Sequence, residues 1–196
     1  MNINLTNLIK KSLVAGMFIG LSGYLSLLIN NQYLSALTFS FGLFFISLLQ
    51  MNLFTGKVGF ANKNDIFILI IMLINNIIGV WFIGGILRLT SNASIVFEKC
   101  IELTQIKLQE NIFIHFTESI MCGMLMFLAV VSFNIYKHYI CIMLPVFVFI
   151  ICGFEHSITN SFYYIFSNNF LNSMPYLFIN IIGNTVGSLF FKAIIN

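Results

Sequence analysis

Residues 139–166 read YICIMLPVFVFIICGFEHSITNSFYYIF, an apolar stretch whose middle holds a polar run from Glu155 to Asn160. A helix needs roughly 20 apolar residues to cross a bilayer, and a charge at its centre costs about 2.5–3.5 kcal/mol. Gly153 allows a sharp backbone turn there. Irregular backbone at membrane depth is tolerated only beside protein or a watery cavity, and half-helix N-termini suit anions. We therefore predict a broken span that lines a pathway for an anion.

The composition of the whole chain predicts an all-α membrane protein. Of the 196 residues, 59% are hydrophobic and 8% are charged, whereas soluble domains average about 45–50% apolar and about 25% charged residues. A chain with so little polar surface must bury most of its length in a bilayer, where helices satisfy their own backbone groups.

Charge and cysteine content exclude several other classes of protein. The net charge of +3 is too small to indicate a nucleic-acid partner. The four cysteines, Cys100, Cys122, Cys141 and Cys152, form no CxxC pair and no cluster with histidine at metal-ligand spacing. We expect no disulfide framework, no metal and no cofactor.

Six stretches are apolar enough to be membrane spans. They are Leu13–Ile29, Leu34–Leu49, Ile66–Leu89, Ile112–Phe133, Tyr139–Phe166 and Tyr176–Ile195. The hydrophilic stretch 88–111 reads as an extramembrane loop with a short helix. It divides a single transmembrane channel domain, residues 1–196, into halves of about 1–97 and 111–196.

The distribution of basic residues predicts the orientation. With the N-terminus in the cytoplasm, the cytoplasmic side holds Lys10, Lys11, Lys57, Lys63, Lys137 and Lys192, and the outer side holds Arg88, Lys99 and Lys107. Because basic residues concentrate on the cytoplasmic side of membrane proteins, we expect a multi-pass protein of the cytoplasmic membrane with both termini inside.

The two halves resemble each other in sequence. Ser12–Met17 matches Ser119–Met124, and Asn76–Gly79 matches Asn180–Gly183, at offsets of 107 (123 minus 16) and 104 (180 minus 76). The second span is interrupted at Asn52–Lys57, as the fifth is after Gly153. An odd number of spans per unit gives halves of opposite orientation. The matches predict a 3+3 inverted repeat with the second and fifth helices broken; chance matching in so biased a composition is the alternative.

Three polar residues in the breaks are candidates for function. Histidine changes protonation near neutral pH, so His156 is the candidate for the transport site, against the alternative of a packing histidine. Glu155 either takes part in transport or ties the broken helix to neighbouring backbone N–H groups. Thr55 either lines the pore or caps the half-helix that follows it.

The remaining histidines lie near span ends. His115 is expected at the membrane interface with no special role. His138 and the adjacent Lys137 either give a cytoplasmic vestibule a positive field that attracts anions or serve only to orient the chain.

Several segments together resemble the formate–nitrite transporter family. They are Phe39–Leu43, Leu53–Gly56, Cys122–Val130, Leu144–Pro145 with Gly153–Asn160, and Asn180–Gly187. They cover most of the chain, and the string Phe-Glu-His-Ser-Ile-Thr-Asn is the most specific of them.

The resemblance implies an aquaporin-like fold of six spans and a homopentamer with one pore in each protomer. By position, it makes His156 the central pore histidine, with Thr55 facing it. It places Phe39 and Leu43 at a cytoplasmic constriction.

Other positions follow from the same resemblance. Leu53 and Phe149 are expected at an outer constriction. Asn160 is expected to support the break, as are Glu155 and Gly153. Gly123 stands where the family has an asparagine, which would remove a polar group from the pore side.

The predicted function is a channel or transporter for small monovalent weak-acid anions such as formate, nitrite or hydrosulfide, with passage that is either passive or proton-linked through His156. A neutral-solute channel of the aquaporin type is one alternative, but neither Pro145 nor Pro175 follows an asparagine as an N-P-A motif requires. A membrane enzyme using Glu155 and His156 is another, but the sequence offers no nucleophile, metal cluster or phosphate loop nearby.

Overall fold

The computed structural model describes residues 4–195 as a bundle of helices, with no strand in that range. The α-helices are α1 (Leu5–Leu27), α2 (Gln32–Leu48), α3 (Phe54–Lys57), α4 (Ile66–Leu87), α5 (Ala93–Gln109), α6 (Ile112–Tyr136), α7 (Ile140–Ile151), α8 (Ser157–Phe166) and α9 (Met174–Ile195). Two short 3₁₀ helices, η1 (Val58–Phe60) and η2 (Lys63–Asp65), follow α3.

Asparagine side chains define where three of the helices begin. Asn4, Asn31 and Asn111 precede α1, α2 and α6, and each accepts a hydrogen bond from a backbone N–H of the first turn. Such a cap satisfies donors that have no partner within the helix. At its other end, α6 stops at Lys137, whose φ of 58° turns the chain out of the helix.

The helices account for the six apolar stretches in two ways. Four helices, α1, α4, α6 and α9, are each long and apolar enough to cross a membrane. The second stretch contains α2 and is followed by α3, and the fifth contains α7 and α8. The expected loop 88–111 holds the helix α5 of 17 residues, which is longer than the short helix predicted.

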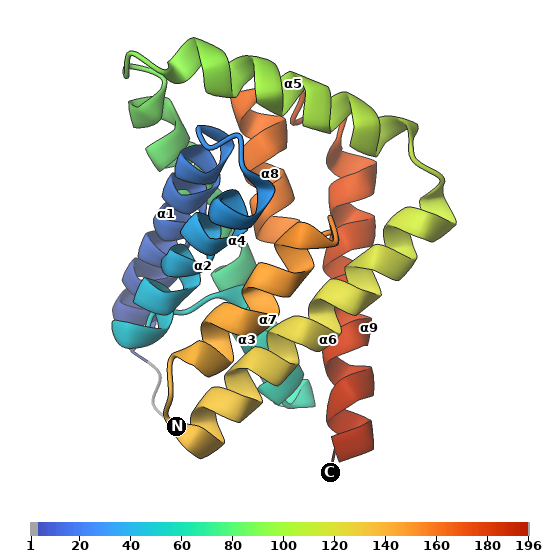
Figure 1. The fold of residues 1–196 in the computed structure, drawn as a ribbon. Helices are drawn as coiled ribbons and strands as arrows, with labels where there is room; N and C mark the ends of the chain where they lie inside the picture. Colours follow the sequence, from blue (N-terminus) through green and yellow to red (C-terminus); the bar gives the residue numbers. More distant parts are fainter. Residues whose placement is uncertain (1–3, 196) are drawn as a thin grey trace.

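Figure 1 shows α5 lying across one end of the bundle, while both ends of the chain lie at the other. We call these ends the α5 face and the termini face. Helix α1 packs along α4 and α6 packs along α9, while α2 and α7 pack against each other in between. The short helix α8 lies under α5 and also contacts α4.

Glycines allow the long helices to approach closely. A Cβ on Gly16 would lie 1.9 Å from a carbonyl oxygen of α4, and one on Gly79 would lie 2.0 Å from a carbonyl oxygen of α1. In the other pair, a Cβ on Gly123 would lie 2.2 Å from α9, and one on Gly187 2.0 Å from α6, again at carbonyl oxygens. Backbone contact of this kind is typical of helices packed in membranes.

These contacts bear on two expectations from the sequence. Gly123 was expected to remove a polar group from the pore side, and it lies against the backbone of Asn184 at the α6–α9 crossing. Gly79 was matched with Gly183, but Gly187 is the residue that makes the equivalent backbone contact.

Replacing Gly123 by alanine should destabilise the protein by about 1–3 kcal/mol, because the new methyl group has no room at the crossing. The measurement is the thermal unfolding midpoint of the detergent-solubilised protein. Gly85→Ala is the matched control, since a Cβ there meets no described atom within 4 Å. Equal midpoints for the two variants would contradict the packing at this crossing.

Cys100 should resist alkylation in the folded protein. It lies on α5 with 0% exposure, and burial raises the pKa of its thiol to about 12. The thiol therefore stays protonated, and so unreactive, as the pH rises from 7 to 9. Mass spectrometry after iodoacetamide treatment should show little modification of Cys100 until detergent denaturation exposes it. Equal rates before and after denaturation would contradict this prediction.

Candidate functional site

A buried asparagine on α9 holds the start of α8. The Oδ1 atom of Asn184 accepts a hydrogen bond from the N–H of Ser157 at 2.9 Å. Its Nδ2 donates to the carbonyl oxygens of Ser119 and Glu155, both at 2.8 Å. One amide thus satisfies a carbonyl within the break and the N–H that begins α8, and ties both to α6.

Asn76 does the same for the start of α3. Its Oδ1 accepts from the N–H of Phe54 at 2.8 Å, and its Nδ2 donates to the carbonyl oxygens of Ser12 at 2.6 Å and Asn52 at 2.9 Å. Asn76 therefore matches Asn184, at an offset of 108 (184 minus 76), and not Asn180 as the sequence suggested.

His156 lies in the break before α8, and its side chain reaches the start of α3 after the other break. Its Nδ1 accepts a hydrogen bond from the N–H of Thr159 at 3.2 Å and lies 3.0 Å from the hydroxyl of Thr159, so that the ring caps α8. A backbone N–H can only donate, so Nδ1 carries the lone pair and the neutral ring carries its proton on Nε2. Nε2 then donates to the hydroxyl oxygen of Thr55 at 2.9 Å. The Thr55 hydroxyl proton is left to donate elsewhere.

An aromatic pair lies on one side of this histidine. The ring of Phe149 stacks on that of His156, with centroids 5.4 Å apart and planes within 9°. Phe39 packs edge-on against Phe149 at 6.0 Å. All three side chains are fully buried, which keeps water from much of the imidazole.

A cavity of about 120 Å³ reaches His156 from the α5 face. Phe149, Asn160 and Gly153 line it, together with Lys107 of α5. His156 is therefore adjacent to this cavity, although its own side chain is fully buried.

A larger cavity of about 310 Å³ lies toward the termini face, between α2, α3 and α6. Leu43 and Leu53 line it, and Lys57 and Lys137 give it positive charge. His138, which was grouped with Lys137, is exposed beside this cavity but is not part of its lining.

The structure places the four apolar residues that were expected at the constrictions. Leu53 was expected beside Phe149 at the outer constriction, and Phe39 beside Leu43 at the cytoplasmic one. In the structure Leu53 and Leu43 both line the larger cavity, and Phe39 contacts Phe149. The two constrictions stay a prediction; three of these four residues line one of the cavities.

Glu155 is buried beside the smaller cavity and is bonded to two side chains. Its Oε1 accepts from the Lys107 ammonium, and its Oε2 accepts from the amide of Asn160. If Glu155 had a structural role, the sequence predicted that its partners would be backbone N–H groups. The partners observed are side chains. Gly153, with a φ of +72°, provides the turn that brings Glu155 into this position.

A family model described as formate/nitrite transporter matches residues 1–196. The chain belongs to the formate/nitrite transporter family. Its members are transporters, so this chain is a multi-pass membrane transport protein and not an enzyme, as the sequence predicted. No curated protein sequence matches the chain.

Two solved structures have the same fold as this transporter. One is described as an FNT family ion channel: it has a TM-score of 0.77 and 19% sequence identity, and the match covers 98% of this chain and 88% of that one. The other is described as a pentameric formate channel with formate bound: it has a TM-score of 0.75 and 20% identity, with 97% and 94% covered.

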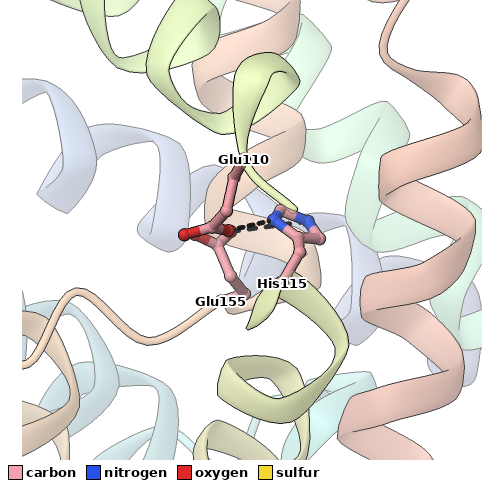
Figure 2. A group of neighbouring side chains, drawn as sticks. All are labelled: Glu110, His115 and Glu155. Carbon is pink, nitrogen blue, oxygen red and sulfur yellow. Dashed lines mark hydrogen bonds and ion pairs between the residues drawn. The ribbon is translucent and has the colours of Figure 1, made fainter. Parts of the chain in front are cut away.

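Sequence reasoning missed three residues of the transporter's site. Lys107 was considered only as a basic residue on the outer side, in the loop 88–111. Asn184 was passed over in favour of Asn180, which accepts a hydrogen bond from the Ser119 hydroxyl. His115 was expected at the interface, but it is fully buried with its Nδ1 2.8 Å from Glu110, as Figure 2 shows.

Replacing Asn184 by leucine should destabilise the transporter, because it leaves the Ser157 N–H and two carbonyl oxygens buried without partners. An unsatisfied buried group costs about 1–3 kcal/mol. The thermal midpoint in detergent measures the effect. Asn75→Leu is the control, because within residues 4–195 the Asn75 amide bonds only to Ile71 of its own helix. A larger loss in the control would overturn this role for Asn184.

Proposed function

We propose that this chain is an anion channel through which formate, nitrite, hydrosulfide or a similar weak-acid anion passes between the two cavities. The observation that carries the proposal is the hydrogen bond of 2.9 Å between Thr55 and His156, which joins the two breaks. One cavity reaches His156 and the other reaches Leu53, two residues before Thr55. Membership of the formate/nitrite transporter family supports the class of solute.

The proposal includes an architecture of six spans in a 3+3 inverted repeat. Helix α2 with α3, and α7 with α8, then form the second and fifth spans, each broken near the middle of the membrane. The equivalent hydrogen bonds of Asn76 and Asn184 support this relation, as do the equivalent backbone contacts of the glycines. We also propose that the termini face is cytoplasmic and that the chain forms a homopentamer, as one structural neighbour does.

Charge would draw anions into the larger cavity, which Lys57 and Lys137 line. Lys107 lines the smaller one, where its charge is paired with that of Glu155. Helix α8 begins beside His156, so the positive end of its dipole points toward the pathway. These fields raise the local concentration of anions, but they act on the vestibules and not on the narrow segment between them.

The narrow segment between the cavities is apolar. Leu43 and Leu53 border it on one side, and Phe149 borders it on the other. A bare charge is costly in such surroundings, whereas a protonated weak acid is not charged. The segment therefore favours solutes that can bind a proton in the adjoining cavity.

The hydrogen bond by which His156 caps α8 determines which group carries that proton. Protonation of His156 at Nδ1 would displace the N–H of Thr159 from its acceptor. The neutral ring is therefore proposed to act as a hydrogen-bond donor that holds Thr55, whose hydroxyl donates to the solute. The proton that crosses is then carried by the solute and not by His156.

Flux of formate, nitrite and hydrosulfide into proteoliposomes, measured against pH, tests the proposal. Wild-type flux should rise as the pH falls toward the pKa of the solute. Thr55→Val should lower it by roughly 10-fold, the equivalent of about one hydrogen bond, while keeping the shape of the side chain.

His156→Phe should lower the flux at least as far, because it removes both the cap of α8 and the partner of Thr55. His138→Phe, on the exposed loop at the termini face, is the control and should transport normally. The proposal fails if none of the three anions moves, or if neither His156→Phe nor Thr55→Val changes the flux.

A further inference from the structure

We propose that His115 and Glu155, with Glu110 behind the imidazole, form a binding site for a divalent cation of the zinc class near the α5 face. Glu110 follows the last residue of α5, His115 lies in the first turn of α6, and Glu155 lies in the break between α7 and α8. One possible ligand atom from each lies within 4.8 Å of the other two. Figure 2 shows both carboxylates turned toward the same imidazole.

The first argument is a buried nitrogen without a partner. His115 has 0% exposure, and nothing in residues 4–195 makes a hydrogen bond to its Nε2. The nearest carboxylate oxygen is Oε2 of Glu155 at 3.8 Å, which is too long for a hydrogen bond. A lone buried polar atom costs about 1–3 kcal/mol, so a small cation between these two atoms would be stabilising.

The second argument is the tautomer of His115. Its Nδ1 lies 2.8 Å from Oε2 of Glu110, and a carboxylate accepts the proton of a neutral imidazole there. Nε2 then presents a lone pair toward Glu155. A carboxylate that orients histidine through its second nitrogen is the usual support of a metal-binding imidazole.

The third argument is distance. Zinc lies about 2.0–2.1 Å from a histidine nitrogen and about 2.0–2.2 Å from a carboxylate oxygen, so its tetrahedral geometry puts two such ligand atoms about 3.3–3.5 Å apart. The separation of 3.8 Å between Nε2 and Oε2 exceeds this by only a few tenths of an ångström. The ion would fit with a small closure of the two side chains, and water would complete its coordination.

Charge also favours a cation. Lys107 is the one basic side chain bonded to the cluster within the described part of the chain, and it occupies Oε1 of Glu155. With a neutral imidazole, two carboxylates and one ammonium leave one negative charge, which a divalent ion more than offsets. The Glu110 side chain behind the imidazole is 22% exposed, whereas the side chains of His115 and Glu155 are buried.

A bound ion would act on the pathway through Glu155. Its carboxylate holds Lys107 and Asn160, both of which line the smaller cavity, and the next residue is His156. Coordination draws Oε2 toward His115 and weakens the bond to Asn160. We therefore expect zinc to slow anion flux; this second part rests on the proposed function, whereas binding does not.

Binding is tested by titrating the purified full chain in detergent with Zn²⁺ at pH 7 in a calorimeter. The wild type should bind about one ion per chain, and His115→Gln and Glu110→Gln should each weaken binding by roughly 10–100-fold. His138→Gln, on the exposed loop at the termini face, should bind as the wild type does. Mg²⁺ should not compete, because it prefers oxygen ligands.

Two results would overturn the site. If the wild type binds no zinc, the proposed site is wrong. If both His115→Gln and Glu110→Gln bind as tightly as the wild type, any bound zinc is an adventitious ion only. Should His115→Gln fail to fold, Glu110→Gln decides the question, because its changed group is partly exposed.

The effect on transport is measured separately with Zn²⁺ added at the α5 face of proteoliposomes. Flux should fall in the wild type and in His138→Gln, but not in His115→Gln. If zinc binds and flux does not change, the coupling to the pathway is wrong and the site stands. If no anion moves even without zinc, the proposed function fails and the binding result is unaffected.

Discussion

Backbone groups exposed by a broken helix have no water to bond to inside a membrane, and this protein meets that constraint with two asparagines. Asn76 and Asn184 each bond to a free N–H at the start of a short helix, to a carbonyl within the break, and to a carbonyl of a neighbouring long helix. Without such partners each break would leave several buried polar groups unsatisfied. The breaks, and with them the cavities they border, depend on these two side chains.

The same constraint explains why the site belongs to both halves of the chain. Thr55 comes from the short helix of the first half, and His156 precedes the short helix of the second. Each half carries its own asparagine on its last long helix. The polar contact at the centre of the proposed pathway forms only when the two halves pack together, with α2 and α7 between them.

Much of the fold could be predicted from the sequence because hydropathy reports directly on membrane spans. The polar run at Glu155 and His156 marked the break in the fifth apolar stretch, and Gly153 marked its turn. The choice between Asn180 and Asn184 could not be made in this way. Asn180 begins a string identical to Asn76–Gly79, and only the hydrogen bonds show that its neighbour one turn later has the equivalent place.

Other features of the site depend on how the neighbouring helices bury each residue, which cannot be read from the sequence. Phe39 and Leu43 lie one turn apart on the same helix, and the cavity or ring that each faces is decided by the neighbouring helices. His115 sits at the start of a helix after a polar segment, a pattern typical of an exposed residue. It is buried because α5 folds back over the bundle and brings Glu110 against it.

The imidazole of His156 uses its two nitrogens for different purposes. Nδ1 completes the first turn of α8, and Nε2 bonds across to the other half of the chain. A side chain such as asparagine could cap the helix equally well, but it could not reproduce the aromatic stack with Phe149. A replacement for residue 156 would therefore have to provide the cap of α8 and the bond to Thr55 at the same time, from different edges of a single ring.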